Sequence, residues 1–522
     1  MARWPQTMLA SASRLRIYGL IAWALVSVVV IADSIPAAGS VSELADEQIL
    51  GRTIADFDVR IPQLMATYDV PGVGVALVQH GTLVWSNAYG YANVDAADPM
   101  TVEAVVRAES ISKSVTAWGV MRLVERGLVD LDDPVAGYLR RSALANNGFP
   151  DDDLTLRQLL SHTAGMPLGT IGVEYSPHDN VPTLDENLLQ EAHLVREPGT
   201  SFSYSNVGFD VLELVIEEVT GENFARYMDR EVLQPLGMSD SSFAWSEDFA
   251  RAVPTGYDLR GRPVPPYVYP AKASGGLFTT VEDLGRFVSA GMAAPSSSAS
   301  AVLELGSIEQ MYTPTVKISG LFRFVTPAYG LGYFVEDLPS GERVVWHGGQ
   351  GSGWMTDFHG IPETGDGIVI VSNSQRSWPL IAHVLLMWTE ASGLGPVGFS
   401  NIVAATRATW LLVGSVLLVS LWQLWRVGTK LRSGHRAVAP LARRARFARF
   451  GEAFAGIGLI GILVWGMSQD YLFVSSVFPT ATSWLGIATA ALAVVLLLSA
   501  ATPPTCRRSH GPERSCSREE IP

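Results

Sequence analysis

Four stretches of the chain are apolar enough to enter a membrane, and the first lies near the N-terminus. Arg14 and Arg16 precede an apolar run from Ile17 to Ala32, and small residues follow it as far as Ser40. This order is typical of an export signal, and the length of the run also suits a short membrane anchor. We therefore predict a signal peptide or an N-terminal membrane anchor at residues 1–40, and either one sends the following segment across the membrane.

The other three apolar stretches lie near the C-terminus, at residues 408–425, 453–467 and 484–501. We predict that they are the membrane spans of a transmembrane region, residues 396–502. The loop between the first two is rich in arginine and lysine, whereas residues 468–483 hold a single charge, Asp470. Basic loops stay on the cytoplasmic side of a membrane. We therefore expect a multi-pass protein of the cell membrane, in contact with the lipid bilayer, with a cytoplasmic tail at 503–522 and an external segment before residue 408.

The pattern between these ends predicts one large extracytoplasmic domain, residues 41–395. Leu50, Ile54 and Phe57 recur at helical spacing, and the strand-like runs 73–79 and 82–89 predict a hairpin about a two-residue turn. Further strands are expected at 329–335, 343–347, 354–361 and 367–373, before an apolar helix at 379–390. Strands at both ends with helices between them favour the α+β class, in which the terminal segments share one antiparallel sheet.

Charge and cysteine content narrow the chemistry of this domain. Residues 33–400 hold 21 basic and 46 acidic residues, a net charge of −25. This negative charge repels the phosphate backbone, so we expect no nucleic-acid partner. The two cysteines, Cys506 and Cys516, both lie in the tail. The domain therefore holds no disulfide, no thiolate nucleophile and no zinc–cysteine site.

One segment carries the elements of a nucleophilic site. Ser110-Ile111-Ser112-Lys113 is the chain's single Ser-x-x-Lys, at the start of a helix predicted over 114–126. A spacing of three places Ser110 and Lys113 on one helical face, so that an unprotonated lysine can take the serine's proton. The same pattern also fits an exposed capping segment, and by itself it does not decide between the two.

Two later segments accompany it, Tyr204-Ser205-Asn206 and His347-Gly348-Gly349-Gln350. In this order the three segments resemble the signatures of the serine β-lactamase and penicillin-binding protein family, which are Ser-x-x-Lys, Tyr-x-Asn and Lys-Thr-Gly or His-Gly-Gly. The resemblance covers about residues 44–390. With Tyr-x-Asn as its second motif, the chain resembles class C β-lactamases, penicillin-binding esterases and D-Ala-directed peptidases in particular. The resemblance implies a β-lactamase/transpeptidase-like fold, in which an antiparallel sheet is flanked by terminal helices and joined to a mainly helical subdomain.

The resemblance also implies a role for each motif residue. Ser110 would be the acylated nucleophile, Lys113 its proton acceptor or relay, and Tyr204 the group that carries the proton to the leaving group. The oxyanion hole would be the backbone N–H groups of Ser110 and Gln350. The substrate-binding residues would be Asn206, His347, Gly348 and Gly349. No metal and no organic cofactor is expected.

The third motif departs from the β-lactamase pattern, because His347 stands where a lysine would grip a substrate carboxylate. We expect its pKa near the ordinary value of about 6.5, so that it becomes a cation at mildly acidic pH. Without a permanent cation, ester or amide turnover is favoured over β-lactam or D-Ala hydrolysis. His162, beside Thr163, is expected to cap or buttress a helix end.

These observations predict a membrane-anchored serine hydrolase that acts through an acyl-enzyme outside the cytoplasm. Its substrate would be a small molecule or peptide, namely an ester, an amide or a D-amino-acid peptide, with cell-wall fragments as one source. One alternative is a D-Ala-D-Ala carboxypeptidase or β-lactamase. Another is a catalytically silent membrane protein that binds wall fragments or a partner, although such a module has no need of a nucleophile with its base.

Overall fold

The computed structural model describes residues 46–140, 142, 154–169, 173–249, 252–292, 302–438, 446–468 and 473–505. The chain divides into two compact units, one ending at Ala405 and the other beginning at Thr406. The predicted N-terminal signal or anchor, 1–40, and most of the predicted cytoplasmic tail lie outside the described residues.

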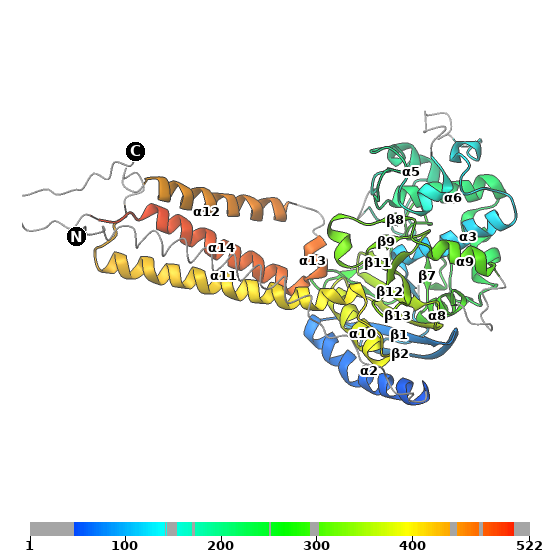
Figure 1. The fold of residues 1–522 in the computed structure, drawn as a ribbon, viewed down its shortest axis with the longest axis horizontal. Coiled ribbons are helices and arrows are strands. Elements are labelled where there is room, and N and C mark those ends of the chain that lie inside the picture. The colour runs from blue at the N-terminus through cyan, green and yellow to red at the C-terminus, as the bar shows by residue number, and fades with distance from the viewer. Residues whose placement is uncertain are drawn as a thin grey trace, which may run out of the picture. The chain divides into compact units, whose positions relative to one another are not determined.

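The first unit is built on a nine-stranded antiparallel sheet with the strand order β3-β2-β1-β13-β12-β11-β10-β9-β8 (Figure 1). Both ends of the domain contribute to it, because β1 pairs with β13 and sets Val75 opposite Ile370. The expectation that the terminal segments share one antiparallel sheet is confirmed. The strands are β1 Gly72–Gln79, β2 Thr82–Asn93, β3 Asp98–Pro99, β8 Val316–Lys317, β9 Ala328–Tyr329, β10 Phe334–Asp337, β11 Arg343–Gly351, β12 Trp354–Ile361 and β13 Asp366–Ser372. Two-stranded pairs are formed by β4 Val106–Arg107 with β7 Phe278–Thr279, and by β5 Gly256–Tyr257 with β6 Pro263–Val264.

The predicted hairpin is present, formed by β1 and β2. Its two turn residues, His80 and Gly81, have φ angles of 48° and 71°. Two successive left-handed residues make the turn whose twist matches that of the flanking strands, and the register shifts once further along the hairpin, between Leu77 and Val78.

One predicted strand is wrong in its middle. The expected run 329–335 is divided, because β9 ends at Tyr329 and β10 begins at Phe334. At Gly330 a Cβ would lie 2.2 Å from the carbonyl oxygen of Met311, and Gly332 has a φ of 83°. The chain turns here through backbone approaches that only glycine permits, which the apolar pattern does not reveal.

Helices cover the sheet and form a helical subdomain. In the first unit α2 packs against α10, α8 packs against β1 and β13, and α6 contacts α3, α4, α5 and α7 (Figure 1). The helices are α2 Asp46–Tyr68, α3 Ser112–Glu125, α4 Leu156–Leu160, α5 Leu184–Glu191, α6 Asn206–Thr220, α7 Phe224–Met228, α8 Val281–Ala290, α9 Leu305–Tyr312 and α10 Trp378–Ala391, with shorter turns η2 Glu109–Ile111, η3 Val135–Gly137, η5 Asp229–Leu233, η8 Gly320–Phe324 and η9 Gly398–Ser400. The α+β class is thus observed.

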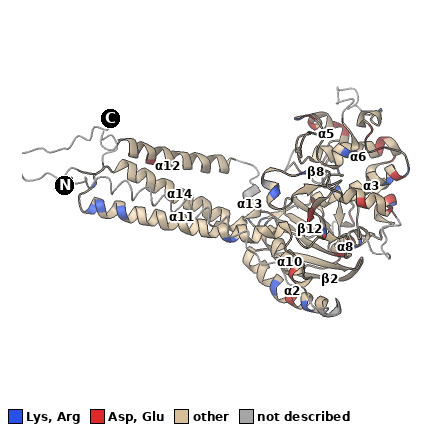
Figure 2. Ribbon diagram, in the orientation of Figure 1, with Lys and Arg blue, Asp and Glu red and all other residues tan. Residues whose placement is uncertain are grey.

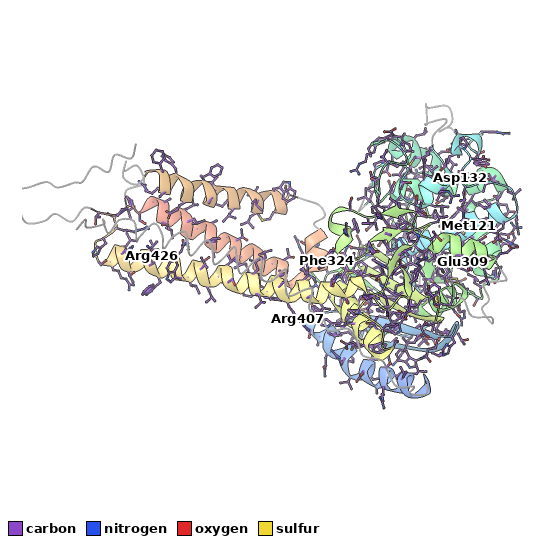
Figure 3. All side chains as sticks on the ribbon, viewed as in Figure 1. Met121, Asp132, Glu309, Phe324, Arg407 and Arg426 are labelled. Atoms are coloured by element: carbon purple, nitrogen blue, oxygen red, sulfur yellow. The ribbon has the colours of Figure 1, made fainter. Side chains whose placement is uncertain are left out.

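Among the residues that the structure describes, three helices are long and apolar enough to cross a membrane, and all lie in the C-terminal part of the chain. They are α11 Asn401–Arg432, α12 Arg446–Met467 and α14 Pro479–Ala501, with the short α13 Phe473–Val477 before the last. The predicted spans 408–425, 453–467 and 484–501 each lie within one of them. Figure 2 shows α14 without a charged residue. In α11, Arg407 and Arg426, both labelled in Figure 3, bracket 18 uncharged residues, about 27 Å of helix and close to the thickness of a bilayer's hydrocarbon core.

Candidate active site

The nucleophile candidate lies on the turn η2, which runs directly into α3. Ser110 is partly exposed, whereas Lys113, one helical turn later, is completely buried. The lysine Nζ lies 3.2 Å from the serine Oγ. A partly exposed hydroxyl in contact with a buried amine is the arrangement that a general base and its nucleophile require.

The hydrogen bonds of Lys113 suit both the neutral and the charged form of its amine. Its Nζ donates to Asn206 Oδ1 at 2.8 Å and to the carbonyl oxygen of Ser274 at 2.7 Å. Both of these oxygens can only accept, so they use two N–H groups. A neutral amine then has its lone pair left for the Ser110 hydroxyl, while a charged one has a third N–H to donate to it. Moving the proton between Ser110 and Lys113 therefore requires no rearrangement of the other two bonds.

Burial sets the protonation of Lys113. Removal from water disfavours its charge and lowers its pKa to about 7, although the carboxylates of Asp210 and Glu109 act in the opposite direction. Asp210 lies on α6 one turn after Asn206, and its pKa is raised to about 7, first by burial. The two groups titrate as a pair, and a lysine that is partly neutral at pH 7 can serve as a base. Asp210 matches none of the three motifs and was missed by the sequence analysis.

The loop that carries Ser274 is tied to the helices on either side of it. Glu213 of α6 accepts the backbone N–H groups of Lys272 and Ala273, the latter at 2.8 Å. Thr116 of α3 donates its hydroxyl to the carbonyl oxygen of Ala273 at 3.0 Å. These bonds hold the Ser274 carbonyl in place against Lys113.

Tyr204 lies immediately before α6, and the structure places it beside the same pair. Its ring centroid is 5.0 Å from Lys113 Nζ, and its pKa is raised by burial well above the usual value, while a hydrogen bond with Ser110 lowers it. The phenol therefore keeps its proton at neutral pH. It can donate that proton to a leaving group, and it cannot serve as a phenolate base.

His162 supports Tyr204, a contact that sequence analysis missed. The residue has a φ of 56° and is 1% exposed. Its ring lies 4.2 Å from that of Tyr204, and its Nδ1 accepts the backbone N–H of Ser205 at 3.1 Å. Because Ser205 is the N-cap of α6, His162 fixes both the start of this helix and the tyrosine before it.

The third motif forms the end of β11 and passes against the nucleophile turn. A Cβ at Gly349 would lie 2.1 Å from the carbonyl oxygen of Ala108, and one at Gly351 would lie 2.3 Å from the Glu109 carboxyl. Gly348 and Gln350 face the other side, where Trp378 of α10 donates to Gln350 Oε1 at 2.9 Å. Two of the glycines are therefore required for β11 to pack against the turn that carries Ser110.

The expectation that the pKa of His347 lies near 6.5 is wrong. The side chain is completely buried, its Nδ1 donates to the Gly348 carbonyl at 2.8 Å, and its Nε2 lies 3.2 Å from the Tyr329 hydroxyl. Burial, and then the charge of Lys113, lower its pKa to about 3. The histidine is a neutral residue that connects β11 to β9, and it offers no cation to a substrate carboxylate.

One prediction follows from this burial. Two esters that differ only in a free carboxylate should keep a constant ratio of kcat/KM between pH 6 and 8, because His347 stays neutral throughout this range. Steady-state kinetics on both esters at each pH measures the ratio. A ratio that rises more than about threefold in favour of the carboxylate ester as the pH falls would mean that His347 titrates in contact with substrate.

A buried ion pair behind Ser110 was also missed. Arg107 Nε and Glu109 Oε1 are 2.7 Å apart, and Tyr267 and Tyr269 donate their hydroxyls to the Glu109 carboxylate at 2.8 and 3.0 Å. Glu109 has a φ of 51°, a strained value for a residue with a side chain. The network holds this backbone and thus the position of the next residue, Ser110. Among the described residues, no cluster of side chains is placed to hold a metal ion.

The fold and the Ser110–Lys113 pair are those of the β-lactamase-fold family, whose members are generally serine hydrolases. The profile of the family described as Beta-lactamase matches residues 57–384, which is more than half of the chain, so the chain belongs to that family. This confirms the predicted family and fold. The solved octameric penicillin-binding protein homologue from Pyrococcus abyssi superposes with a TM-score of 0.57 at 28% identity, over 66% of this chain and 78% of that one.

Two curated relatives are similar over shorter parts of their length. Protein flp of Staphylococcus aureus is 25% identical over 327 residues, which is 60% of this chain and 62% of flp. Esterase EstB of Burkholderia gladioli is 34% identical over 214 residues, 38% of this chain and 54% of EstB. The chain thus spans less than two thirds of the length of either relative.

Proposed function

We propose that the chain is a membrane-anchored serine hydrolase that cleaves esters outside the cytoplasm through an acyl-enzyme on Ser110. The observation that carries the proposal is the contact set of Lys113, in which two oxygens use two N–H groups and the third contact is the Ser110 hydroxyl. The similarity to Esterase EstB supports the choice of reaction. Because His347 is buried and neutral, it offers no cation to a substrate's carboxylate, which favours neutral esters over substrates that bind through a carboxylate.

In the acylation step, the Ser110 oxygen forms a bond to the ester carbonyl carbon while its proton passes to Lys113. The backbone N–H groups of Ser110 and Gln350 are the inferred donors to the carbonyl oxygen as it becomes negative. Tyr204 then gives its proton to the departing alkoxide and is reprotonated from Lys113. The alcohol therefore leaves with the proton of Tyr204, Lys113 replaces that proton with one it holds after deprotonating Ser110, and the acyl group stays on the serine.

In the deacylation step, water attacks the acyl carbon and gives a proton to Lys113, which returns it to the Ser110 oxygen as the acid leaves. Along the Ser110–Lys113 hydrogen bond, a proton passes from serine to lysine in acylation and from lysine to serine in deacylation. Lys113 thus acts first as a base and then as the conjugate acid. Asn206, which accepts from Lys113, holds the amine between Ser110 and α6.

The proposal is tested with the full chain in lipid nanodiscs. The substrates are p-nitrophenyl butyrate, a chromogenic cephalosporin and an N-acyl-D-Ala-D-Ala peptide. We expect turnover of the ester with a kcat/KM at least about tenfold above that of either carboxylate substrate, the factor that one missing charge-assisted hydrogen bond supplies. Hydrolysis of the cephalosporin or the peptide in preference to the ester would overturn the proposal and favour a β-lactamase or a carboxypeptidase.

The topology in this proposal makes a separate prediction. A reporter fused after Arg436 is expected to be cytoplasmic and one fused after Gly395 external, since the arginine-rich loop stays inside. Alkaline phosphatase and green fluorescent protein fusions at both positions measure this. If both sites give the same result, the first C-terminal span does not cross the membrane.

A further inference from the structure

The turn η8 carries exposed aromatic side chains beside the catalytic residues. Phe322 is 39% and Phe324 49% exposed, and Arg323 between them is exposed as well. Large apolar side chains exposed together with a cation are typical of segments that lie at a membrane surface, where the rings enter the headgroup layer and the cation meets phosphate.

The C-terminal end of η8 is fixed to the place where the chain leaves the domain. Asn401 Nδ2 donates to the carbonyl oxygen of Phe324 at 3.0 Å. Nearby, a Cβ at Gly398 would lie 2.5 Å from the carbonyl oxygen of Val325, so the two segments are in direct backbone contact. Because Phe324 is hydrogen-bonded to Asn401, the Phe324 label in Figure 3 shows where the chain leaves the domain.

The exit point must lie close to the bilayer, whichever way the domain is turned. The uncharged stretch 408–425 requires a hydrocarbon environment, and Arg407 stands at its domain side. Arg407 is six positions after Asn401, so the distance between them is at most about 20 Å in an extended chain and about 9 Å in a helix. The exposed rings of η8 are therefore within reach of the headgroup layer.

The same turn reaches the catalytic residues. The ring of Phe322 lies 6.4 Å from that of Tyr204, nearly parallel to it at 15°, and 6.4 Å from that of Phe202. One short segment thus extends from the chain exit to the proton donor of the proposed reaction. Phe322 and Phe202 give this side of the site an apolar surface.

We propose that η8 lies in the headgroup layer of the bilayer and that the substrate of Ser110 is an amphiphilic ester taken from that layer, with its hydrocarbon chain along Phe322. This inference rests on the proposed ester hydrolysis and adds the substrate class. An exposed phenylalanine beside the entrance to the site gains hydrophobic contact from such a chain and none from a small polar ester.

The position of η8 is measured without reference to activity. Phe324→Cys is introduced into the full chain carrying Cys506→Ser and Cys516→Ser, labelled with a nitrobenzoxadiazole dye and reconstituted in phosphatidylcholine vesicles. Leu305→Cys is the matched control, because Leu305 is 56% exposed and begins α9, the helix of Glu309, which Figure 3 labels well away from Phe324. Doxyl-labelled lipid should quench the dye at 324 and leave the dye at 305 bright. Equal quenching at the two sites would overturn the inference.

The substrate class is measured with p-nitrophenyl acetate in solution and p-nitrophenyl palmitate in the vesicles. Phe322→Ser is expected to lower the ratio of kcat/KM for palmitate to that for acetate by about tenfold, and Leu305→Ser to leave the ratio as in the parent chain. An unchanged ratio in Phe322→Ser overturns this inference alone. A parent chain that hydrolyses neither ester overturns the proposed function.

Discussion

Replacing Ser110 with alanine is expected to lower kcat/KM for esters by at least about 10⁴-fold, since loss of a nucleophile removes the covalent route and leaves only binding and the oxyanion donors. The substitution removes one oxygen from a partly exposed turn, so folding should be retained. Intact-mass analysis after incubation with a fluorophosphonate should show one adduct on the parent chain and none on the variant.

The control for this prediction is Ser201→Ala, an exposed serine in the segment before Tyr204. It should keep both the adduct and the rate. An adduct of unchanged mass on Ser110→Ala would place the nucleophile on another residue, and the assignment of the Ser-x-x-Lys motif would then be wrong.

Local patterns predicted much of the sheet. The strand-like runs 73–79 and 82–89 predicted the hairpin, and the run 354–361 coincides with β12. β1 and β12 are short runs buried along almost their whole length, and the hairpin is closed by two turn residues, so both signals act over a few positions. The predicted strand 329–335 failed because its interruption depends on the approach of Met311, a contact with no local signal.

The spacing of Ser110 and Lys113 was equally local, and a helical turn suffices to bring them together. The groups that surround these two residues could not be predicted from local spacing. Asp210 and the Ser274 carbonyl reach the site by tertiary packing, and so do Tyr267 and Tyr269, whose hydroxyls donate to the Glu109 carboxylate. The pKa of His347 failed for the same reason, since it depends on how completely other segments exclude water from the ring.

In the proposed mechanism, the buried groups around Ser110 bring the pKa of its base, Lys113, down toward neutral pH. Water exclusion alone would lower the pKa of Lys113, and the carboxylate of Asp210 limits that effect. The charged state of Lys113 is favoured when Asp210 has lost its proton. The pair can therefore hold one proton between them close to pH 7, which keeps part of the lysine population neutral without an external base.

The last prediction tests this pair through the pH dependence of the rate. The parent chain should lose kcat/KM as the pH falls below about 7, because Lys113 must be neutral to accept the serine's proton. Lys113→Arg should lower the rate by about 10³-fold or more at every pH and show no such acid limb, since a guanidinium does not give up its proton.

Asp210→Asn is the companion variant, and it is expected to shift the acid limb of the pH profile, whereas Lys113→Arg abolishes that limb. Removing the carboxylate takes away an interaction that raises the pKa of Lys113, so the acid limb should move to lower pH and relative activity at pH 6 should increase. Initial rates from pH 5 to 9, with circular dichroism at each pH to check folding, measure both variants. If the limb stays in place in Asp210→Asn, or if Lys113→Arg keeps a tenth of the parent rate, Lys113 is not the base and its contact with Ser110 serves only to position the serine.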